Sequence, residues 1–126
     1  MQQSQRVSSE DAAIMDFDTA RRFVLAQTLA PVPGQTPFID CLRRGEAPVP
    51  GQVTSLLLAL KTLAQGLKKE PMIERSLGHA LFILTYESRQ LYLQGKTQNV
   101  DWPPLLDDDL SRIAVAVEQI WADAAT

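Results

Sequence analysis

The chain has 126 residues, of which 45% are hydrophobic and 21% are charged, and its formal net charge is −3. This balance is typical of one globular domain and argues against a disordered chain. The acidic total disfavours nucleic acid as a partner, because the protein as a whole repels phosphate. A single cysteine and a single histidine exclude an intramolecular disulfide and a multi-cysteine zinc site, and they fit a reducing, cytoplasmic location.

The N-terminal residues 1–14 are polar and have no apolar period. We therefore expect a flexible segment there, without a signal peptide, and a single helical domain over residues 15–126. Asp16 or Asp18 is a good N-cap for a first helix that runs to about Leu29. Pro31 ends this helix, because the residue before a proline is restricted to extended conformations.

The hexapeptide APVPGQ occurs twice, at 30–35 and at 47–52. One interpretation is a polyproline ligand, but neither copy has prolines three residues apart, as such ligands require. We favour the other interpretation, in which each copy ends one helix and turns the chain towards the next. Between the copies we expect a two-turn helix from Phe38 to Leu42, with Pro37 at its first position.

Three longer helices follow from the spacing of apolar residues. Residues 52–69 have one apolar face, and Lys61, Gln65 and Lys68 lie off it. Because the break at Glu70-Pro71 is so short, this helix and the next are predicted to be an antiparallel αα-hairpin.

The second of these helices runs from Pro71 to about Gln94, and Gly95 is expected to end it. It is apolar on all sides around Phe82, so we expect it to be the central and most buried helix. Its charge-free run is too short for a membrane span, which needs about 20 residues.

The last helix is expected from about Leu105 or Asp107 to Ala124, with Trp121 on its inner stripe. No segment alternates like a strand. The predicted fold class is therefore all-α, a compact bundle of four main helices plus one short helix.

No pattern predicts a catalytic, cofactor-binding or metal-ligating residue. Gly95-Lys96-Thr97 resembles the end of a phosphate-binding loop, but the earlier glycine of that motif is replaced by Gln90. For His79, a partly buried structural role is favoured over metal binding or a catalytic pair with Cys41. Adjacent aspartates at 107–109 point about 100° apart on a helix, so a role at the positive end of the helix dipole is favoured over an ion site.

Surplus apolar residues and basic doublets are the features that point to function. Apolar side chains beyond those that helix packing needs are either covered by the short helix and the proline-rich segments or form an exposed patch. Such a patch would be a partner surface with aromatic residues as its anchors. The basic doublets, including Lys68-Lys69, either gather into an anion-binding patch or remain scattered solubility charges, and we favour the second. The candidate interaction residues are Arg21, Arg22, Arg43, Arg44, Phe82, Tyr86, Tyr92 and Trp102.

We therefore predict a non-enzymatic protein–protein interaction or regulatory protein, with an unknown protein partner and with homodimerisation as one form of the interaction. The alternative is a small-ligand-binding helical protein, or an enzyme, with a pocket between helices near His79, Tyr86 and Glu87.

Two stretches, PVPGQVTSLLLAL at 48–60 and VDWPPLLDDDLSRIAVAV at 100–117, resemble a group of short cyanobacterial proteins. Some members of that group carry a dethiobiotin synthetase label. The resemblance covers the chain from about Met15 onwards and implies a soluble protein of the cyanobacterial interior. It implies no enzymatic activity, because a dethiobiotin synthetase is a much longer phosphate-loop enzyme with a parallel sheet, and this chain has neither feature.

Overall fold

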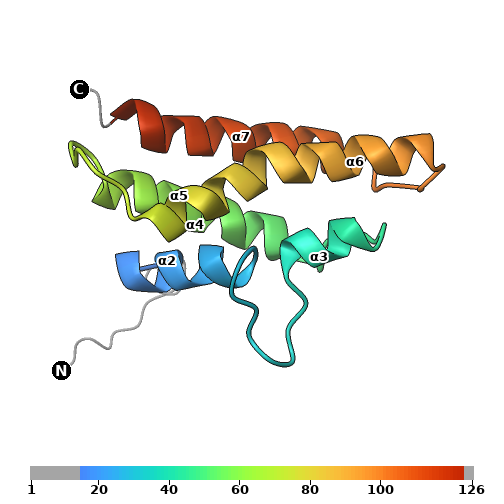
Figure 1. The fold of residues 1–126 in the computed structure, drawn as a ribbon, viewed down its shortest axis with the longest axis horizontal. Helices are drawn as coiled ribbons and strands as arrows, with labels where there is room; N and C mark the ends of the chain where they lie inside the picture. The colour runs from blue at the N-terminus through green and yellow to red at the C-terminus, as the bar shows by residue number, and fades with distance from the viewer. Residues whose placement is uncertain (1–14, 124–126) are drawn as a thin grey trace.

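The computed structural model describes residues 15–123, and the predicted flexible segment at 1–14 lies outside them. Every regular element of the described part is a helix, which confirms the all-α class (Figure 1). The elements are α2 (Phe17–Ala26), α3 (Phe38–Arg43), α4 (Gln52–Gly66), α5 (Arg75–Phe82), the π-helix η1 (Ile83–Glu87), α6 (Ser88–Thr97) and α7 (Leu106–Asp123).

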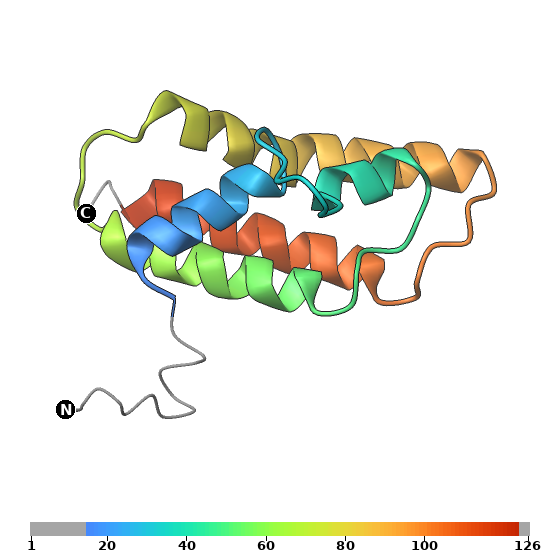
Figure 2. The ribbon, with the colours of Figure 1, turned by 90° about the horizontal axis from the view of Figure 1, so that it is seen from below.

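Four main helical rods pack around one core, with α3 as the short fifth helix. The elements α5, η1 and α6 follow one another without a break and form a single rod. α4 packs against α2 and α7, while α2 also packs against α5, and α7 against η1. The rod and α4 therefore lie at opposite corners of the bundle, and α4 and α7 run in the same direction (Figure 2).

The predicted αα-hairpin of the third and fourth helices is wrong. α4 ends at Gly66 and α5 begins only at Arg75, so the connection at 67–74 is long enough to cross the bundle. The side chain of Arg21 on α2 holds the end of this connection, because its Nε and Nη2 donate to the two carboxylate oxygens of Glu74, both at 2.7 Å. α2 and α7 consequently lie between the two helices.

The helix ends show one correct and one wrong prediction. Asp16 caps α2, because its Oδ1 accepts a hydrogen bond from the backbone N–H of Thr19 at 2.7 Å. Gly95 does not end the central rod, which continues to Thr97. A Cβ atom at position 95 would clash with the indole ring of Trp102, so only a glycine allows this close packing.

Both copies of the repeated hexapeptide form the same turn. The N–H of Gln35 donates to the carbonyl of Val32 at 3.1 Å, and that of Gln52 to the carbonyl of Val49 at 2.9 Å. The glycine inside each turn has a φ of 83°. Proline followed by a left-handed glycine is the pattern of a type II turn. The predicted turn is confirmed in both copies, but neither copy ends a helix, because α2 already ends at Ala26 and α3 at Arg43.

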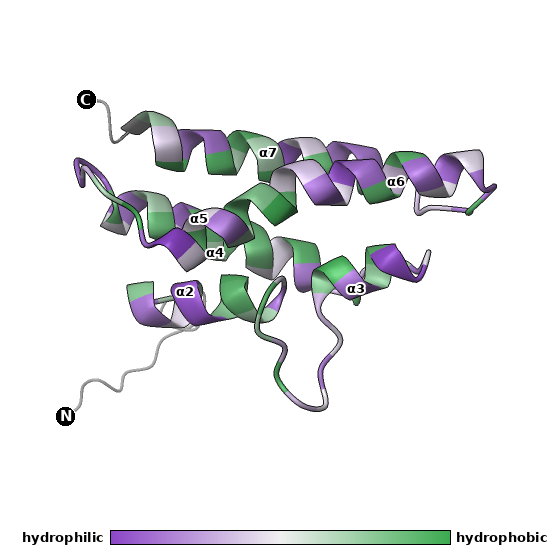
Figure 3. Cartoon of the chain, viewed as in Figure 1, coloured by the Kyte–Doolittle hydropathy of each residue, from purple (hydrophilic) through white to green (hydrophobic). Residues whose placement is uncertain are grey.

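The rod is covered on its inner side and partly bare on its outer side. Leu77, Leu81 and Leu84 are buried in the core, which is shared by all four main rods. Phe82 and Tyr86 remain 52% and 54% exposed. Figure 3 shows hydrophobic bands on the helices alternating with hydrophilic ones, as expected for elements that each bury one face.

Candidate functional site

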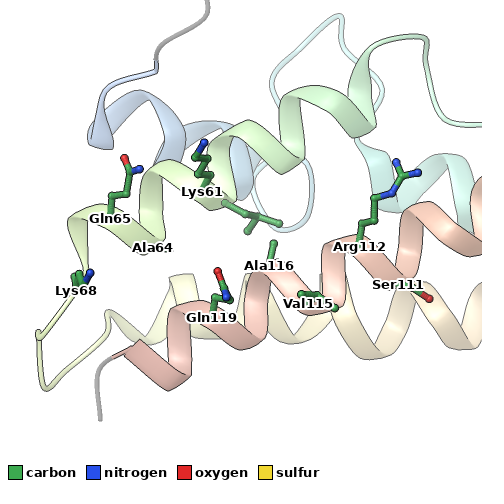
Figure 4. A pocket seen from close by; sticks show the side chains of 10 residues that line it. Lys61, Ala64, Gln65, Lys68, Ser111, Arg112, Val115, Ala116 and Gln119 are labelled. Carbon is green, nitrogen blue, oxygen red and sulfur yellow. The ribbon is translucent and has the colours of Figure 1, made fainter. Parts of the chain in front are cut away.

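A groove of about 610 Å³ runs between α4 and α7 (Figure 4). Its two walls are built alike, because each helix contributes residues at i, i+1, i+4, i+5 and i+8. Residues four apart share one side of a helix, so each wall is a continuous stripe. The lining residues are Leu60, Lys61, Ala64, Gln65 and Lys68 from α4 and the turn after it, and Ser111, Arg112, Val115, Ala116 and Gln119 from α7.

The floor of the groove is apolar and made of small side chains. Ala64 and Ala116 come from opposite walls, and Leu60 is buried beneath them. Because alanine ends at Cβ, neither helix fills the space between the two stripes. Val115 at the edge is 63% exposed, so apolar surface is open to a partner along the groove.

The rim of the groove is positively charged. Lys61, Lys68 and Arg112 line it, and no carboxylate does. Arg112 Nη1 lies 3.4 Å from Asp109 Oδ1, whereas neither lysine makes an ion pair within residues 15–123. Sequence reasoning missed this site because it read the two lysines as solvent-facing residues, and pairing their stripe with that of α7 requires the tertiary structure.

Phe82 and Tyr86, which were predicted to be interaction residues, form an exposed stacked pair. Their ring centroids are 5.2 Å apart with an interplanar angle of 22°. Phe82 ends α5 and Tyr86 lies within η1, where the hydroxyl of Thr85 donates to the carbonyls of Leu81 and Phe82, both at 3.2 Å. Such hydroxyl-to-carbonyl bonds compete with the helical backbone bonds, and π turns are frequent at functional sites.

Trp121 extends this exposed surface from the neighbouring helix. A Cβ atom at Gly78 would lie 3.5 Å from its ring, and Gly78 precedes Phe82 by one helical turn. Trp121 is 49% exposed. We call Phe82, Tyr86 and Trp121 the aromatic face. The sequence placed Trp121 on the inner stripe of the last helix, so this member was missed.

Tyr92 and Trp102, also predicted as interaction residues, pack against each other instead of joining the aromatic face. Their ring centroids are 6.0 Å apart, and Trp102 Nε1 donates to the carbonyl of Tyr92 at 3.0 Å. Tyr92 is buried, and the side chains of Arg89 and Lys96 lie over its ring. The two aromatic residues attach the linker before α7 to α6.

The basic doublets of α2 and α3 are largely neutralised by nearby carboxylates. Arg22 binds Asp18 on its own helix, at 3.0 Å. Arg43 binds Asp40 at 3.0 Å and Glu87 at 3.3 Å. Among the described residues Arg44 has no such partner, and Arg21 is held by Glu74 as described above.

The alternative pocket near His79, Tyr86 and Glu87 stays a prediction. The best-formed pockets of the described part of the chain have other linings, and none of these three residues belongs to them. His79 is exposed, contrary to the predicted partly buried role. Cys41 is buried, and its Sγ donates to Gln52 Oε1 at 3.9 Å. Burial raises the pKa of the Cys41 thiol, which disfavours the reactive thiolate.

Within residues 15–123, no cluster of three or more histidine, cysteine or carboxylate side chains is placed to hold a metal ion. Asp107 instead accepts a hydrogen bond from Arg89 Nη1 at 2.6 Å. The helices of this same part are all too short or too polar to cross a bilayer.

No protein-family model, curated protein or solved structure matches this chain. The resemblance to cyanobacterial proteins therefore stays a prediction, and function has to be inferred from the surface geometry.

Proposed function

We propose that this protein is a non-enzymatic protein–protein interaction protein, and that its α4–α7 groove binds an amphipathic helix of the partner. The observation that carries the proposal is the pair of matched stripes, with a floor of small apolar residues and a rim of cations. Grooves of this kind are filled by helices that present apolar residues at i, i+3, i+4 and i+7.

The dimensions of the groove suit a short helix. Each wall extends from position 60 to 68 or from 111 to 119, so its first and last residues are about 12 Å apart at about 1.5 Å per residue. A partner helix would therefore make contact over two to three turns. The alanines at 64 and 116 let its backbone approach closely, so small or medium apolar residues are expected at its contacting positions.

The positive charge of the rim favours a partner helix that carries negative charge. Lys61 and Lys68 have no carboxylate partner in the described chain, so a helix with Asp or Glu beside its apolar stripe would supply one. The same charges disfavour a symmetric dimer through this groove, because the cations of one copy would face those of the other.

The groove can be tested with a fluorescein-labelled, stapled helical peptide that has alanine and leucine on one face and glutamate beside it. We expect it to bind in an anisotropy titration, and the same peptide with lysine for glutamate to bind at least about tenfold more weakly. Lys61→Glu should lower the affinity for the acidic peptide by a similar factor. Arg44→Glu is the matched control, because it makes the same charge change outside the groove.

The apolar edge of the groove needs a separate variant. Val115→Ser should weaken peptide binding, whereas Val32→Ser, at another exposed valine outside the groove, should leave it unchanged. Equal affinity for the acidic and basic peptides, or an affinity that ignores Lys61 and Val115, would contradict the proposal. Binding of dodecanoate together with no binding of either peptide would assign the groove to a small amphiphile instead.

The aromatic face is a second candidate contact surface and the better place for the predicted homodimer. Three half-exposed aromatic rings are the type of side chain that anchors interfaces. Light scattering coupled to size exclusion should show a dimer that Phe82→Ser converts to a monomer. A wild-type monomer at high concentration would argue against the homodimer and leave the groove proposal standing.

A further inference from the structure

A second pocket, of about 520 Å³, lies between the two type II turns, at the end of α2 and the first turn of α4. It shares no residue with the α4–α7 groove. Phe23, Val49 and Pro50 supply apolar surface, and Gln27, Gln52 and Ser55 supply polar groups. No charged side chain lines it.

The orientation of the two buried glutamine side chains follows from backbone donors. The N–H of Phe38 donates to Gln27 Oε1 at 2.8 Å, and the N–H of Val49 donates to Gln52 Oε1 at 2.9 Å. Because a backbone N–H can only donate, the oxygen of each amide must face it. Gln52 Nε2 then donates to Gln27 Oε1 at 2.7 Å and to the carbonyl of Thr36 at 2.9 Å.

This arrangement leaves the Nε2 of Gln27 without a partner. Its Oε1 accepts two hydrogen bonds, but no acceptor within residues 15–123 pairs with its two N–H groups. Gln27 is only 5% exposed. An unpaired buried donor is unfavourable, and native proteins pair nearly all such groups.

We propose that this pocket binds a neutral small molecule that places a carbonyl oxygen on Gln27 Nε2 and an apolar body against Phe23 and Pro50. The ligand is neutral because no lining charge would offset the desolvation of an ion. The volume lies in the range of small-ligand pockets, about 300–1,000 Å³. This site goes beyond the proposed function, which uses the other side of α4.

Cyclohexaneacetamide is a suitable probe, because it joins a neutral carbonyl to an apolar ring. The readout is the side-chain NH₂ signal of Gln27 in a ¹⁵N-correlated NMR spectrum. We expect a saturable shift of this signal, and binding of the anion cyclohexaneacetate that is at least about tenfold weaker. A capped Ala-Val-Ala tripeptide tests whether a peptide carbonyl can take the same place.

Gln27→Glu keeps the acceptor for Phe38 and Gln52 and replaces only the free donor by oxygen. At pH 8, where the carboxylate is favoured, it should abolish binding of the amide. Ser55→Leu should also abolish binding by filling the pocket. The control for Ser55→Leu is Thr54→Leu, which makes a similar change at the neighbouring position outside this pocket and should leave binding of the amide unchanged.

Two results would overturn the inference. The first is an unchanged affinity for the amide in both Gln27→Glu and Ser55→Leu. The second is a Gln27 signal that no probe shifts, together with a crystal structure that shows only an ordered water on Nε2.

Discussion

At the scale of single residues, the ion pair between Arg21 and Glu74 fixes the route of the chain between α4 and α5. Hydrogen bonds from Arg21 and from Ser76 lower the pKa of Glu74 from 4.5 to about 2. Both partners of the pair are partly exposed, and solvent screens such pairs strongly. Its value lies more in placing the connection at 67–74 against α2 than in overall stability.

The lowered pKa of Glu74 predicts a pH dependence with a definite sign. A carboxyl group whose folded pKa lies below its unfolded pKa stabilises the fold above the unfolded value, and this contribution is lost as the pH falls. The difference in free energy of unfolding between wild type and Glu74→Gln should therefore shrink from about pH 4.5 down to about pH 2. Denaturant melts across this range check it, with Glu118→Gln as a control at a carboxylate that has no partner in the described chain. A difference that does not change with pH would contradict the expected role.

Gln52 is a second residue on which the fold depends. Its amide bonds to the N–H of Val49, the carbonyl of Thr36 and the Oε1 of Gln27; the bond to Gln27 is buried and the other two are partly buried. Gln52→Met keeps the side-chain length but leaves these groups unpaired, so we expect a loss of about 3 kcal/mol in the free energy of unfolding. Gln35, at the equivalent position of the other hexapeptide, is exposed, and Gln35→Met should be nearly neutral.

At the scale of the elements, glycines inside helices mark close contacts between rods. Gly95 on α6 lies under the indole of Trp102, and Gly66 at the end of α4 lies under the ring of Phe17. Gly78 on α5 has more space, because a Cβ there would meet Trp121 at the ordinary contact distance of 3.5 Å. Helix propensity favours alanine at all three positions. Packing alone therefore decides whether a glycine-to-alanine substitution stabilises or destabilises the protein.

Two of these glycines give a matched pair of variants. Gly95→Ala should destabilise the protein by about 1–3 kcal/mol, because the new methyl group displaces Trp102 and its hydrogen bond to Tyr92. Gly78→Ala should stabilise it by up to about 1 kcal/mol through helix propensity. Thermal and denaturant unfolding measure both, and equal effects of the two variants would disprove the packing explanation.

At the scale of the whole molecule, the four rods form one core while the rod at 75–97 keeps an exposed aromatic side. Leu81 is fully buried and Phe82, its neighbour, is half exposed. Adjoining residues of a helix point in directions about 100° apart, so one can be buried while the next is exposed. The rod is apolar around Phe82, yet only its inner side is covered. The aromatic face, the α4–α7 groove and the pocket between the turns occupy different parts of this bundle.

This difference between neighbours provides a test of the architecture. Leu81→Asp places a charge in the core and should remove cooperative folding, at a cost of more than about 4 kcal/mol. Phe82→Asp makes a comparable chemical change one residue later, at an exposed position, and should leave cooperative folding intact. Circular dichroism melts distinguish the two, and a cooperative melt of Leu81→Asp would refute the arrangement.

The amino-acid sequence alone determined the all-α class, the approximate helices, an N-cap at Asp16 or Asp18 and the two turns with Gly34 and Gly51. These features depend on residues close together in the chain, namely apolar spacing, capping side chains and proline–glycine pairs. The sequence also predicted Phe82 and Tyr86 as candidate interaction residues, and their exposure in the structure agrees with an apolar surplus on the surface.

Only the tertiary structure decided which helices are neighbours and where the surface is hollow. The short break at Glu70-Pro71 did not make α4 and α5 neighbours, and the role of Gly95 depends on Trp102, which comes from the next segment. The groove arises because Ala64 and Ala116 face each other, and the free amide of Gln27 arises because Phe38 and Gln52 both bond to its oxygen. The apolar period of a helix indicates which of its faces is buried. Contacts between residues distant in the chain determine which helix covers that face and where a groove or pocket is left between them.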